Sequence, residues 1–518
     1  MENKIYSLWG DEKKLFKTNE ALYDYIFKML NVEKSNIEWD GYYTLNNLGS
    51  DEKLKEKLLQ CLPLERISFD AKERFYHSIG KGSIEYARLI EKRDFRIVDA
   101  VVYPKEDEIP CLFNKLTDTE FITFGGGTSV TGGILPSGKK RYSISIDTRN
   151  LDYFDLDIDS MILEAGAGIK GPDLEENLKR FNLTLGNFPE SFEYSTLGGW
   201  IATNAAGQES NRYGKIKDMV LGVKLINPSG IYIDHKVPAE SAFFRISDIA
   251  VGSEGSYGII TRAWLKVHKI PEKLFFKSYM FRNFEEGLNA IRDEFTQGNS
   301  PMVSRLSDET ETYLSMLAIE DNILTKLFKS YLKSRNVLDK GSILIVMDDK
   351  KVNLHGGIGL GSTPAKLWKK TRYDRPYMYN ELLKHGIIAE TIETSTPWSS
   401  AYLLYKNVIS SFNEKIIELN SRGIIMCHAS HEYVSGTALY FTFLFYSKNN
   451  KEEVLKELRR NVINSILEHG GSISHHHGIG TYLSDEFIFY KGNTMKIIRS
   501  LKKNFDENNV LNPGIIKY

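Results

Sequence analysis

Three glycine-rich stretches, each next to a short β-branched run, constrain the fold of this chain more than any other feature. They read FGGGTSVTGG (124–133), STLGGWIATNAAG (195–207) and VGSEGSYGIIT (251–261). Consecutive glycines let a backbone turn its amides inward as an anion-binding nest, and small residues let a flat ligand lie against the chain. One such loop is equally compatible with a turn that holds no ligand, but three in sequence order indicate one extended binding groove.

The chemistry of the first loop fits a diphosphate, because the hydroxyl groups of Thr128 and Ser129 directly follow three glycines. This loop is not a GxGxxG motif that opens a helix, and the pattern GxxxxGKS/T is absent from the chain. Neither a Rossmann NAD site nor a P-loop ATPase is therefore indicated.

The charge balance excludes some classes of partner. Among 518 residues, 67 Lys and Arg almost cancel 68 Asp and Glu, so no global field recruits nucleic acid or an anionic membrane. No apolar run approaches the roughly 20 residues that span a bilayer, and the start MENKIYSLWGDEKK lacks the apolar core of a signal peptide. We expect a cytoplasmic protein with a small-molecule or lipid substrate; a homodimer and peripheral membrane contact are both left open.

The cysteines bear on the compartment. Cys61, Cys111 and Cys427 are isolated and form no CxxC pair. This pattern argues against a disulfide framework or a zinc knuckle and favours a reducing compartment.

The residue composition and spacing change three times along the chain, which predicts four parts. Residues 1–90 carry leucines at helical spacing and predict a helical N-terminal segment. Residues 91–272 alternate short β-branched runs with glycines, and residues 273–460 alternate amphipathic helices with strands. Residues 461–518 return to glycine and histidine.

The three glycine stretches, with RYG after the second, resemble the FAD-binding (PCMH-type) fold of the vanillyl-alcohol-oxidase superfamily. Within it the chain is similar to the alkylglycerone-phosphate synthase (alkyl-dihydroxyacetonephosphate synthase) family, from WGD at Trp9 through ERFYHSIGKG and ETSTPW to SHHHGIG and NNVLNPG. The resemblance implies an α+β fold: a two-subdomain FAD-binding domain (91–272), a substrate or cap domain with an antiparallel sheet flanked by helices (273–460), and a C-terminal segment (461–518) that returns to the flavin.

The resemblance also implies which residues hold FAD. The first glycine stretch would bind the diphosphate, the second would line the flavin, and the third would close over adenosine and flavin. The residues concerned are Gly125, Gly126, Gly127, Thr128, Ser129, Thr131, Pro189, Ser195, Thr196, Gly198, Gly199, Thr203, Glu254, Gly255, Gly258 and Ile260. Some relatives carry a flavin-linking His where this chain has Gly127 and Thr128, so we expect non-covalent FAD.

Two residues of the cap match catalytic positions of the family. Arg305, in SRLSD, sits where the family keeps an arginine near the flavin, and a guanidinium can grip phosphate or carboxylate with two hydrogen bonds. Tyr440, in GTALYFTFLFY, matches the family's proposed catalytic tyrosine and on strand alternation shares a face with Thr442 and Leu444. A phenol donates or accepts a proton, and a neighbouring imidazole would bring its pKa into a useful range. A surface salt bridge and a half-buried structural tyrosine are the alternatives.

The run SISHHHGIG places His475, His476 and His477 side by side. On a strand the first and third would point one way and the second the other, so one metal ion could hardly collect all three. No CxxC or HExxH supplies further ligands, and we expect no metal. The resemblance implies acid/base and substrate-orienting groups beside the flavin, which suits an imidazole pKa near neutrality.

One position departs from the family pattern. Before ETIETSTPW the synthases carry a second arginine, in a PY-x-R-D setting, that is thought to help hold substrate. Here the stretch reads RPYMYNELL, so Tyr379 occupies that slot, and Arg375 lies four residues earlier. The substitution bears directly on how a phosphate-bearing substrate would be held.

Three functions are compatible with these features. The first is ether-lipid synthesis, in which the acyl group of acyl-dihydroxyacetone phosphate is exchanged for a fatty alcohol and FAD is a carrier rather than a net redox agent. Tyr440 and the histidines would then move protons, and Arg305 would steady an anionic group.

The second is FAD-linked dehydrogenation or oxidation of a D-2-hydroxy acid (lactate, glycolate, 2-hydroxyglutarate) or a similar alcohol. Relatives of that kind often carry an HxGDGN-type stretch and a GEHG end, whereas SHEYVSGTALY and SHHHG retain only His431, which favours the synthase. The third, a non-catalytic FAD-binding protein, would have no use for the acid/base set.

Overall fold

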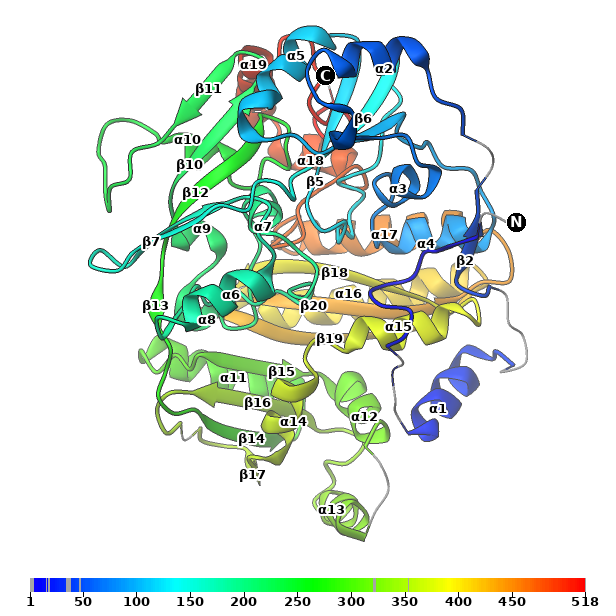
Figure 1. Ribbon diagram of the computed structural model, residues 1–518. Coiled ribbons are helices and arrows are strands. Elements are labelled where there is room, and N and C mark those ends of the chain that lie inside the picture. The colour runs from blue at the N-terminus through cyan, green and yellow to red at the C-terminus, as the bar shows by residue number, and fades with distance from the viewer. Residues whose placement is uncertain are drawn as a thin grey trace.

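The computed structural model describes residues 4–14, 16, 19–33, 39–45, 48–319, 323–352 and 354–517. Its main sheets have four, five and seven strands, with helices packed around them (Figure 1). The predicted α+β class is confirmed, including the antiparallel sheet of the cap.

Two sheets build the glycine-rich half of the chain. In the smaller, with order β3-β4-β6-β5, the last three strands are parallel and β3 is antiparallel. The larger, with order β11-β10-β12-β8-β7, is antiparallel throughout. The strands are β3 (Ile67–Ser68), β4 (Ala100–Val102), β5 (Thr119–Phe124), β6 (Tyr142–Asp147), β7 (Phe154–Asp157), β8 (Ile162–Gly166), β10 (Val220–Asn227), β11 (Gly230–Ile233) and β12 (Ile259–Lys266), with the ribbon β9 (Leu183–Thr184) and β13 (His268–Lys269). The helices are α5 (Ile109–Lys115), α6 (Gly171–Lys179), α7 (Leu197–Thr203), α8 (Ser210–Tyr213), α9 (Ile216–Met219) and α10 (Ile246–Ala250).

The cap is a seven-stranded antiparallel sheet with order β17-β14-β16-β15-β19-β20-β18. Its strands are β14 (Phe275–Phe281), β15 (Val303–Ser307), β16 (Ser342–Asp348), β17 (Ile358–Gly361), β18 (Ile388–Pro397), β19 (Arg422–Tyr433) and β20 (Gly436–Tyr446). Its helices are α11 (Phe284–Thr296), α12 (Glu309–Leu317), α13 (Ile323–Ser334), α14 (Thr363–Thr371), α15 (Arg375–Leu383), α16 (Trp398–Glu418) and α17 (Lys451–Glu468).

The alternation of side chains along β20 explains why one face of the cap sheet is buried in a core and the other face is open. Leu439, Phe441, Phe443 and Phe445 are fully buried in a core that includes apolar side chains of α11, α16 and α17. α16 packs against β18, β19 and β20, and α17 lies along α16. Because successive side chains of a strand point to opposite faces, Tyr440 lies on the other side of the sheet.

Both ends of the chain join this body. The helical N-terminal segment contains α1 (Glu20–Leu30), α2 (Glu52–Leu59), α3 (Ala71–Tyr76) and α4 (Ser83–Ile90), and also the strands β1 (Lys4–Tyr6) and β2 (Tyr42–Thr44), which pair with each other. The C-terminal segment contains α18 (Ser484–Lys491) and α19 (Thr494–Phe505). After α19, the Asn512 side chain donates to the backbone oxygens of Gly133 and Glu254, each at 2.9 Å. The end of the chain therefore reaches two of the glycine stretches.

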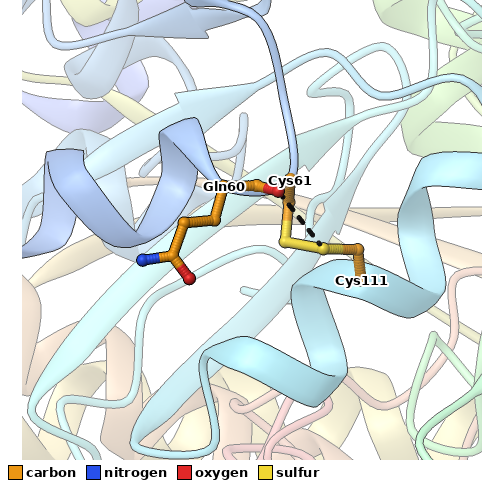
Figure 2. Close-up of a disulfide and its surroundings, with 3 residues drawn as sticks. All are labelled: Gln60, Cys61 and Cys111. Carbon is orange, nitrogen blue, oxygen red and sulfur yellow. Dashed lines mark hydrogen bonds between the residues drawn. A yellow bond between two sulfur atoms is a disulfide. The ribbon is translucent and has the colours of Figure 1, made fainter.

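The expectation of unpaired thiols is wrong for two cysteines. A disulfide joins Cys61, after α2, to Cys111 in α5, with a Cα–Cα distance of 5.5 Å (Figure 2). The Cys111 sulfur also lies 3.9 Å from the Gln60 backbone oxygen. The two cysteines are 50 residues apart, and packing of α2 and α5 in one apolar cluster brings them together. Cys427 is a buried free thiol. The pairing removes the basis on which a reducing compartment was expected.

Among the residues that the structure describes, no helix is both long and apolar enough to cross a bilayer.

Breaking the disulfide should cost stability. A cross-link that closes a loop of this length is expected to contribute about 2–4 kcal/mol to the free energy of unfolding. We expect Cys61→Ser/Cys111→Ser to lower the free energy of unfolding by that amount in urea titrations. The control is dithiothreitol, which should destabilise the native protein and leave the double variant unchanged; equal effects on both would contradict the assignment.

Candidate active site

One cavity of about 1350 Å³ lies between the glycine-rich half and the open face of the cap sheet. Nearly all residues predicted to bind FAD line it: Gly125, Gly126, Gly127, Thr128, Ser129, Pro189, Ser195, Thr196, Gly198, Gly199, Thr203, Glu254, Gly255, Gly258 and Ile260. Thr131 does not, and its hydroxyl instead donates to the His477 backbone oxygen at 3.5 Å. The three stretches therefore form one groove, as the sequence predicts.

The first glycine loop offers free donors to this cavity. Among the described residues, the backbone N–H groups from Gly125 to Val130 have no hydrogen-bond acceptor. Unpaired amides that face a cavity are costly unless a ligand accepts from them. A run of such amides, with the Thr128 hydroxyl beside them, suits the diphosphate of FAD.

Close packing explains the glycines of this loop. A Cβ on Gly126 would lie 2.1 Å from the Tyr194 backbone oxygen, and one on Gly125 would lie 2.3 Å from the Thr196 hydroxyl oxygen. Gly127 has a φ of +67°, which L side chains rarely adopt. The first and second stretches touch through these glycines, and any side chain there would push them apart.

A GxGxxG match exists elsewhere and does not reach the site. It is GAGIKG (166–171), between β8 and α6, and none of its residues is among those that line the cavity. Its glycines pack against backbone instead: a Cβ on Gly168 would lie 1.8 Å from the Thr148 oxygen. These glycines thus serve close packing of the chain, and that no Rossmann-type site is present stays a prediction.

The three histidines lie in a loop, so the predicted alternation along a strand is wrong. Glu393 of β18 shapes the loop. Its carboxylate accepts hydrogen bonds from the Ser474 hydroxyl at 2.7 Å, from the His477 N–H at 2.9 Å and from the His475 N–H. The rings of adjacent histidines lie 5.2 Å (475–476) and 4.4 Å (476–477) apart. His476 and His477 line the cavity, and His475 is not among its lining residues.

Burial keeps most of these imidazoles neutral. It lowers the pKa of His475 and of His476 well below the usual value, and nearby imidazoles add to the effect. Burial likewise lowers the pKa of His431 to about 3 and of His428 to about 4. The expected pKa near neutrality is therefore wrong for His475 and His476, because a buried imidazolium loses its hydration. These rings can pass protons but do not store them.

Arg305 and Arg375 share one carboxylate. Arg305 of β15 donates to Glu311 Oε1 at 2.7 Å, and Arg375, the first residue of α15, donates to the same oxygen at 2.6 Å. Arg305 also lies 2.9 Å from His428 Nε2, whereas Arg375 has no second acceptor among the described residues. The side chain of Arg305 is 14% exposed and that of Arg375 is 30% exposed. Arg375 is thus the more available cation of the cavity.

Tyr440 of β20 lies in register between Glu393 of β18 and His428 of β19. Its ring stacks on His428 at 4.8 Å and lies 5.5 Å from the His477 ring. Burial, reinforced by the Glu190 carboxylate, raises the pKa of Tyr440 well above its usual value. The expectation that a neighbouring imidazole lowers this pKa is wrong, because the His428 imidazole stacked on the ring is itself neutral and burial penalises the phenolate. Tyr440 is therefore a neutral O–H donor that lines the cavity.

His431 belongs to the same cluster, although the sequence marked it only as a remnant. Its ring lies 5.4 Å from the rings of both His475 and His476, and its Nδ1 lies 2.5 Å from the Ser210 hydroxyl. Its φ is +55°, in an irregular stretch of the β19–β20 ladder. Strain of this kind clusters at functional sites. A histidine two residues before the end of a cap strand is the signal that could have found it.

The cluster also contains metal-ligand atom types. Glu393, His475 and His476 each place one such atom within 4.8 Å of the others. However, Glu393 already accepts from Ser474 and two amides, and Nδ1 of His475 faces Nδ1 of His476 at 2.9 Å. Two ring nitrogens at this distance share one proton, and the Glu393 carboxylate holds the loop through its hydrogen bonds. These atoms are therefore already engaged within the protein. That no metal binds stays a prediction.

Comparisons with known proteins agree with this geometry. Residues 99–235 match the model of an FAD binding domain, and residues 358–516 match that of the C-terminal domain of FAD linked oxidases. The chain is 31% identical to an alkyldihydroxyacetonephosphate synthase of Trypanosoma brucei brucei over 488 residues, covering 89% of this chain and 79% of the relative. The chain belongs to the FAD-linked oxidase family.

Members of this FAD-linked oxidase family differ in their reactions. A solved alkyldihydroxyacetonephosphate synthase superposes with a TM-score of 0.81 at 24% identity, covering 98% of this chain and 96% of that one. A D-lactate dehydrogenase of Archaeoglobus fulgidus is 23% identical over 427 residues, covering 80% of this chain and 90% of that one. The protein is thus an FAD-linked enzyme, and the finer reaction has to be argued from the site.

Gly126 gives a direct test of the groove. We expect Gly126→Ala to displace the Tyr194 backbone and to weaken FAD binding about tenfold or more, since overpacking typically costs about 1–3 kcal/mol. The measurement is the bound-flavin content after dialysis and the dissociation constant of FAD by fluorescence. Gly49→Ala is the matched control, because a Cβ there would meet no atom within 4 Å. Equal FAD affinity in both variants would contradict the proposed cradle.

Proposed function

We propose that this enzyme forms ether lipid precursors, exchanging the acyl group of acyl-dihydroxyacetone phosphate for a fatty alcohol. The observation that carries the proposal is the composition of the 1350 Å³ cavity. It joins the FAD groove and a polar cluster to an extended apolar wall. That wall consists of Leu22, Ile26, Leu314, Ala318, Ile319, Phe328, Ile343, Leu360, Leu367 and Met378.

The size of the cavity supports a second ligand beside FAD. Pockets for one small molecule usually measure roughly 300–1,000 Å³, and this cavity has about 1350 Å³. A small hydroxy acid has no use for an apolar wall drawn from α1, α12, α13 and α14. A fatty chain does, because each buried methylene stabilises binding by about 0.8 kcal/mol.

The guanidinium donors at the polar end support an anionic headgroup. Arg305 and Arg375 carry two positive charges against one on Glu311, and neutral His428 adds none. Although burial opposes ionisation, Arg305 and its neighbours hold the pKa of Glu311 well below its usual range. The Glu190 carboxylate, which also lines the cavity and acts on both guanidiniums, balances the remaining charge. The support for a phosphate is therefore the N–H groups of Arg375 that have no second acceptor among the described residues, because these can donate to phosphate oxygens.

The neutral groups around Tyr440 suit proton transfer without net oxidation. FAD, when bound, would supply the carrier chemistry that this exchange needs, and we propose that it is held non-covalently. Tyr440 can donate its O–H to a departing oxygen, and neutral His476 can accept a proton at a ring nitrogen. Because burial disfavours both the phenolate and the imidazolium, a proton taken up here must be passed on.

Two assays decide between ether synthesis and oxidation. Labelled fatty alcohol should enter acyl-dihydroxyacetone phosphate. In a parallel anaerobic titration, D-lactate, D-2-hydroxyglutarate, glycolate and glycerol 3-phosphate should leave the flavin's visible band intact. Full bleaching by any one of them, without label incorporation, would assign the enzyme to the hydroxy-acid dehydrogenases instead. A flavin that no substrate perturbs would mark an inert FAD-binding protein.

Arg375 should carry the charge that Tyr379 lacks. The two residues lie one turn apart on α15, so their side chains share a face of the helix. Arg375→Gln removes a charged hydrogen-bond donor, worth about 1.5–3 kcal/mol, and we expect KM for acyl-dihydroxyacetone phosphate to rise about tenfold to a hundredfold at unchanged FAD content.

The double variant Arg375→Gln/Tyr379→Arg tests whether only the position of the charge differs. It should recover most of the lost affinity. Recovery by Tyr379→Phe in place of Tyr379→Arg would show that the charge is not what matters.

A further inference from the structure

A chain of hydrogen bonds leads from the cavity to the edge of the cap. The Tyr433 hydroxyl lies 2.5 Å from His475 Nε2, and His475 Nδ1 lies 2.9 Å from His476 Nδ1. His476 lines the cavity, whereas His475 and Tyr433 are not among its lining residues. Tyr433 ends β19 at the hairpin and is 39% exposed, and His475 is 8% exposed. The three side chains thus span the wall between cavity and surface.

We propose that Tyr433, His475 and His476 form a proton relay that connects the reacting groups with solvent. The proposal rests on the proposed function in that the reaction needs protons moved into and out of a closed site. In it His476 is the group that faces the substrate, and His475 and Tyr433 are positioning residues that act through it.

One proton can cross the relay and leave both imidazoles neutral. In the resting state His476 carries its proton on Nδ1 and donates to His475 Nδ1, and His475 carries its proton on Nε2 and donates to the Tyr433 oxygen. When His476 Nε2 takes a proton from the substrate, its Nδ1 proton moves to His475. The Nε2 proton of His475 then moves to Tyr433, whose own proton leaves to water. One proton crosses the wall, both imidazoles end neutral as the other tautomer, and the reverse sequence delivers a proton.

The surroundings fix this geometry. Glu393 accepts the backbone N–H of His475, and the Lys215 ammonium donates to the His475 backbone oxygen. At the outer end, the Trp398 indole N–H donates to the Tyr433 backbone oxygen at 3.1 Å. These contacts hold His475 and Tyr433 by their backbones, so their side-chain atoms are free to hydrogen-bond to each other. Proton transfer needs that arrangement.

Burial explains why a relay is needed. Both imidazoles strongly resist becoming imidazolium. His476 alone could therefore not hold a substrate proton, and a single base that cannot store a proton turns over slowly unless a second acceptor is in contact.

The test uses the FAD-loaded enzyme with Tyr433→Phe, His475→Gln and the double variant. We expect kcat for alcohol exchange to fall about tenfold to a hundredfold in each, with KM and FAD content unchanged. The double variant should lose no more than the worse single variant, because both break the same chain. Added imidazole should restore part of the rate in Tyr433→Phe, and the solvent isotope effect should rise. Tyr490→Phe, a tyrosine on α18 that is 42% exposed, is the matched control.

Two outcomes would overturn the relay while leaving the proposed function intact. One is a Tyr433→Phe enzyme with wild-type kcat and isotope effect. The other is a loss of rate that imidazole does not relieve and that adds to the loss in His475→Gln, which marks a packing defect.

If the wild-type protein shows no alcohol exchange, the proposed function fails and nitrogen NMR of labelled histidine decides the relay separately. The His475 and His476 ring nitrogens should both shift in Tyr433→Phe. Unchanged shifts would overturn the relay.

Discussion

The buried carboxylate of Glu393 is the interaction on which the site depends. It stands on a cap strand and holds the C-terminal histidine loop through two backbone amides and the Ser474 hydroxyl. Burial alone would favour the protonated acid, but the hydrogen bonds that the carboxylate accepts from the loop keep the pKa of Glu393 below its usual value. The cost of burying the ion is offset only when the loop is in place. The carboxylate therefore ties the position of three histidines to the register of the cap sheet.

The cavity carries its permanent charges and its transferable protons on different residues. The permanent charges are the two guanidiniums and Glu311, which stay ionised because they neutralise each other at 2.6–2.7 Å. The transferable protons sit on groups that burial keeps neutral, namely Tyr440 and the imidazoles. A proton that moves between two neutral groups creates two charges, which a low-dielectric site disfavours, so each transfer here has to be coupled to a second one. Anion binding and proton transfer thus use different residues of one cluster.

The sequence predicted the groove well because its signal is in the backbone. Glycines such as Gly126 and Gly127 are required by close approach and by positive φ, and these constraints can be read from residue type alone. The face of Tyr440 was also predictable, since alternation in β20 is regular. The conformation of the histidine loop was not predictable. It depends on Glu393, some 80 positions earlier, and no local sequence pattern indicates that contact. Two other contacts could not be predicted for the same reason, since long-range packing decides them. They are the disulfide between Cys61 and Cys111, and the contact of both Arg305 and Arg375 with Glu311.

The residues that line the cavity come from almost the whole length of the chain, from Trp9 to His477 after α17. This has a consequence for biosynthesis. Domains generally fold in order as they leave the ribosome, N-terminal parts first. Here the glycine-rich half can collapse early, but the histidine loop and the Asn512 contacts to Gly133 and Glu254 become available only when residues 475–512 have emerged. The nascent chain therefore carries an open, half-lined groove until those residues fold back, and the cofactor site closes late in folding.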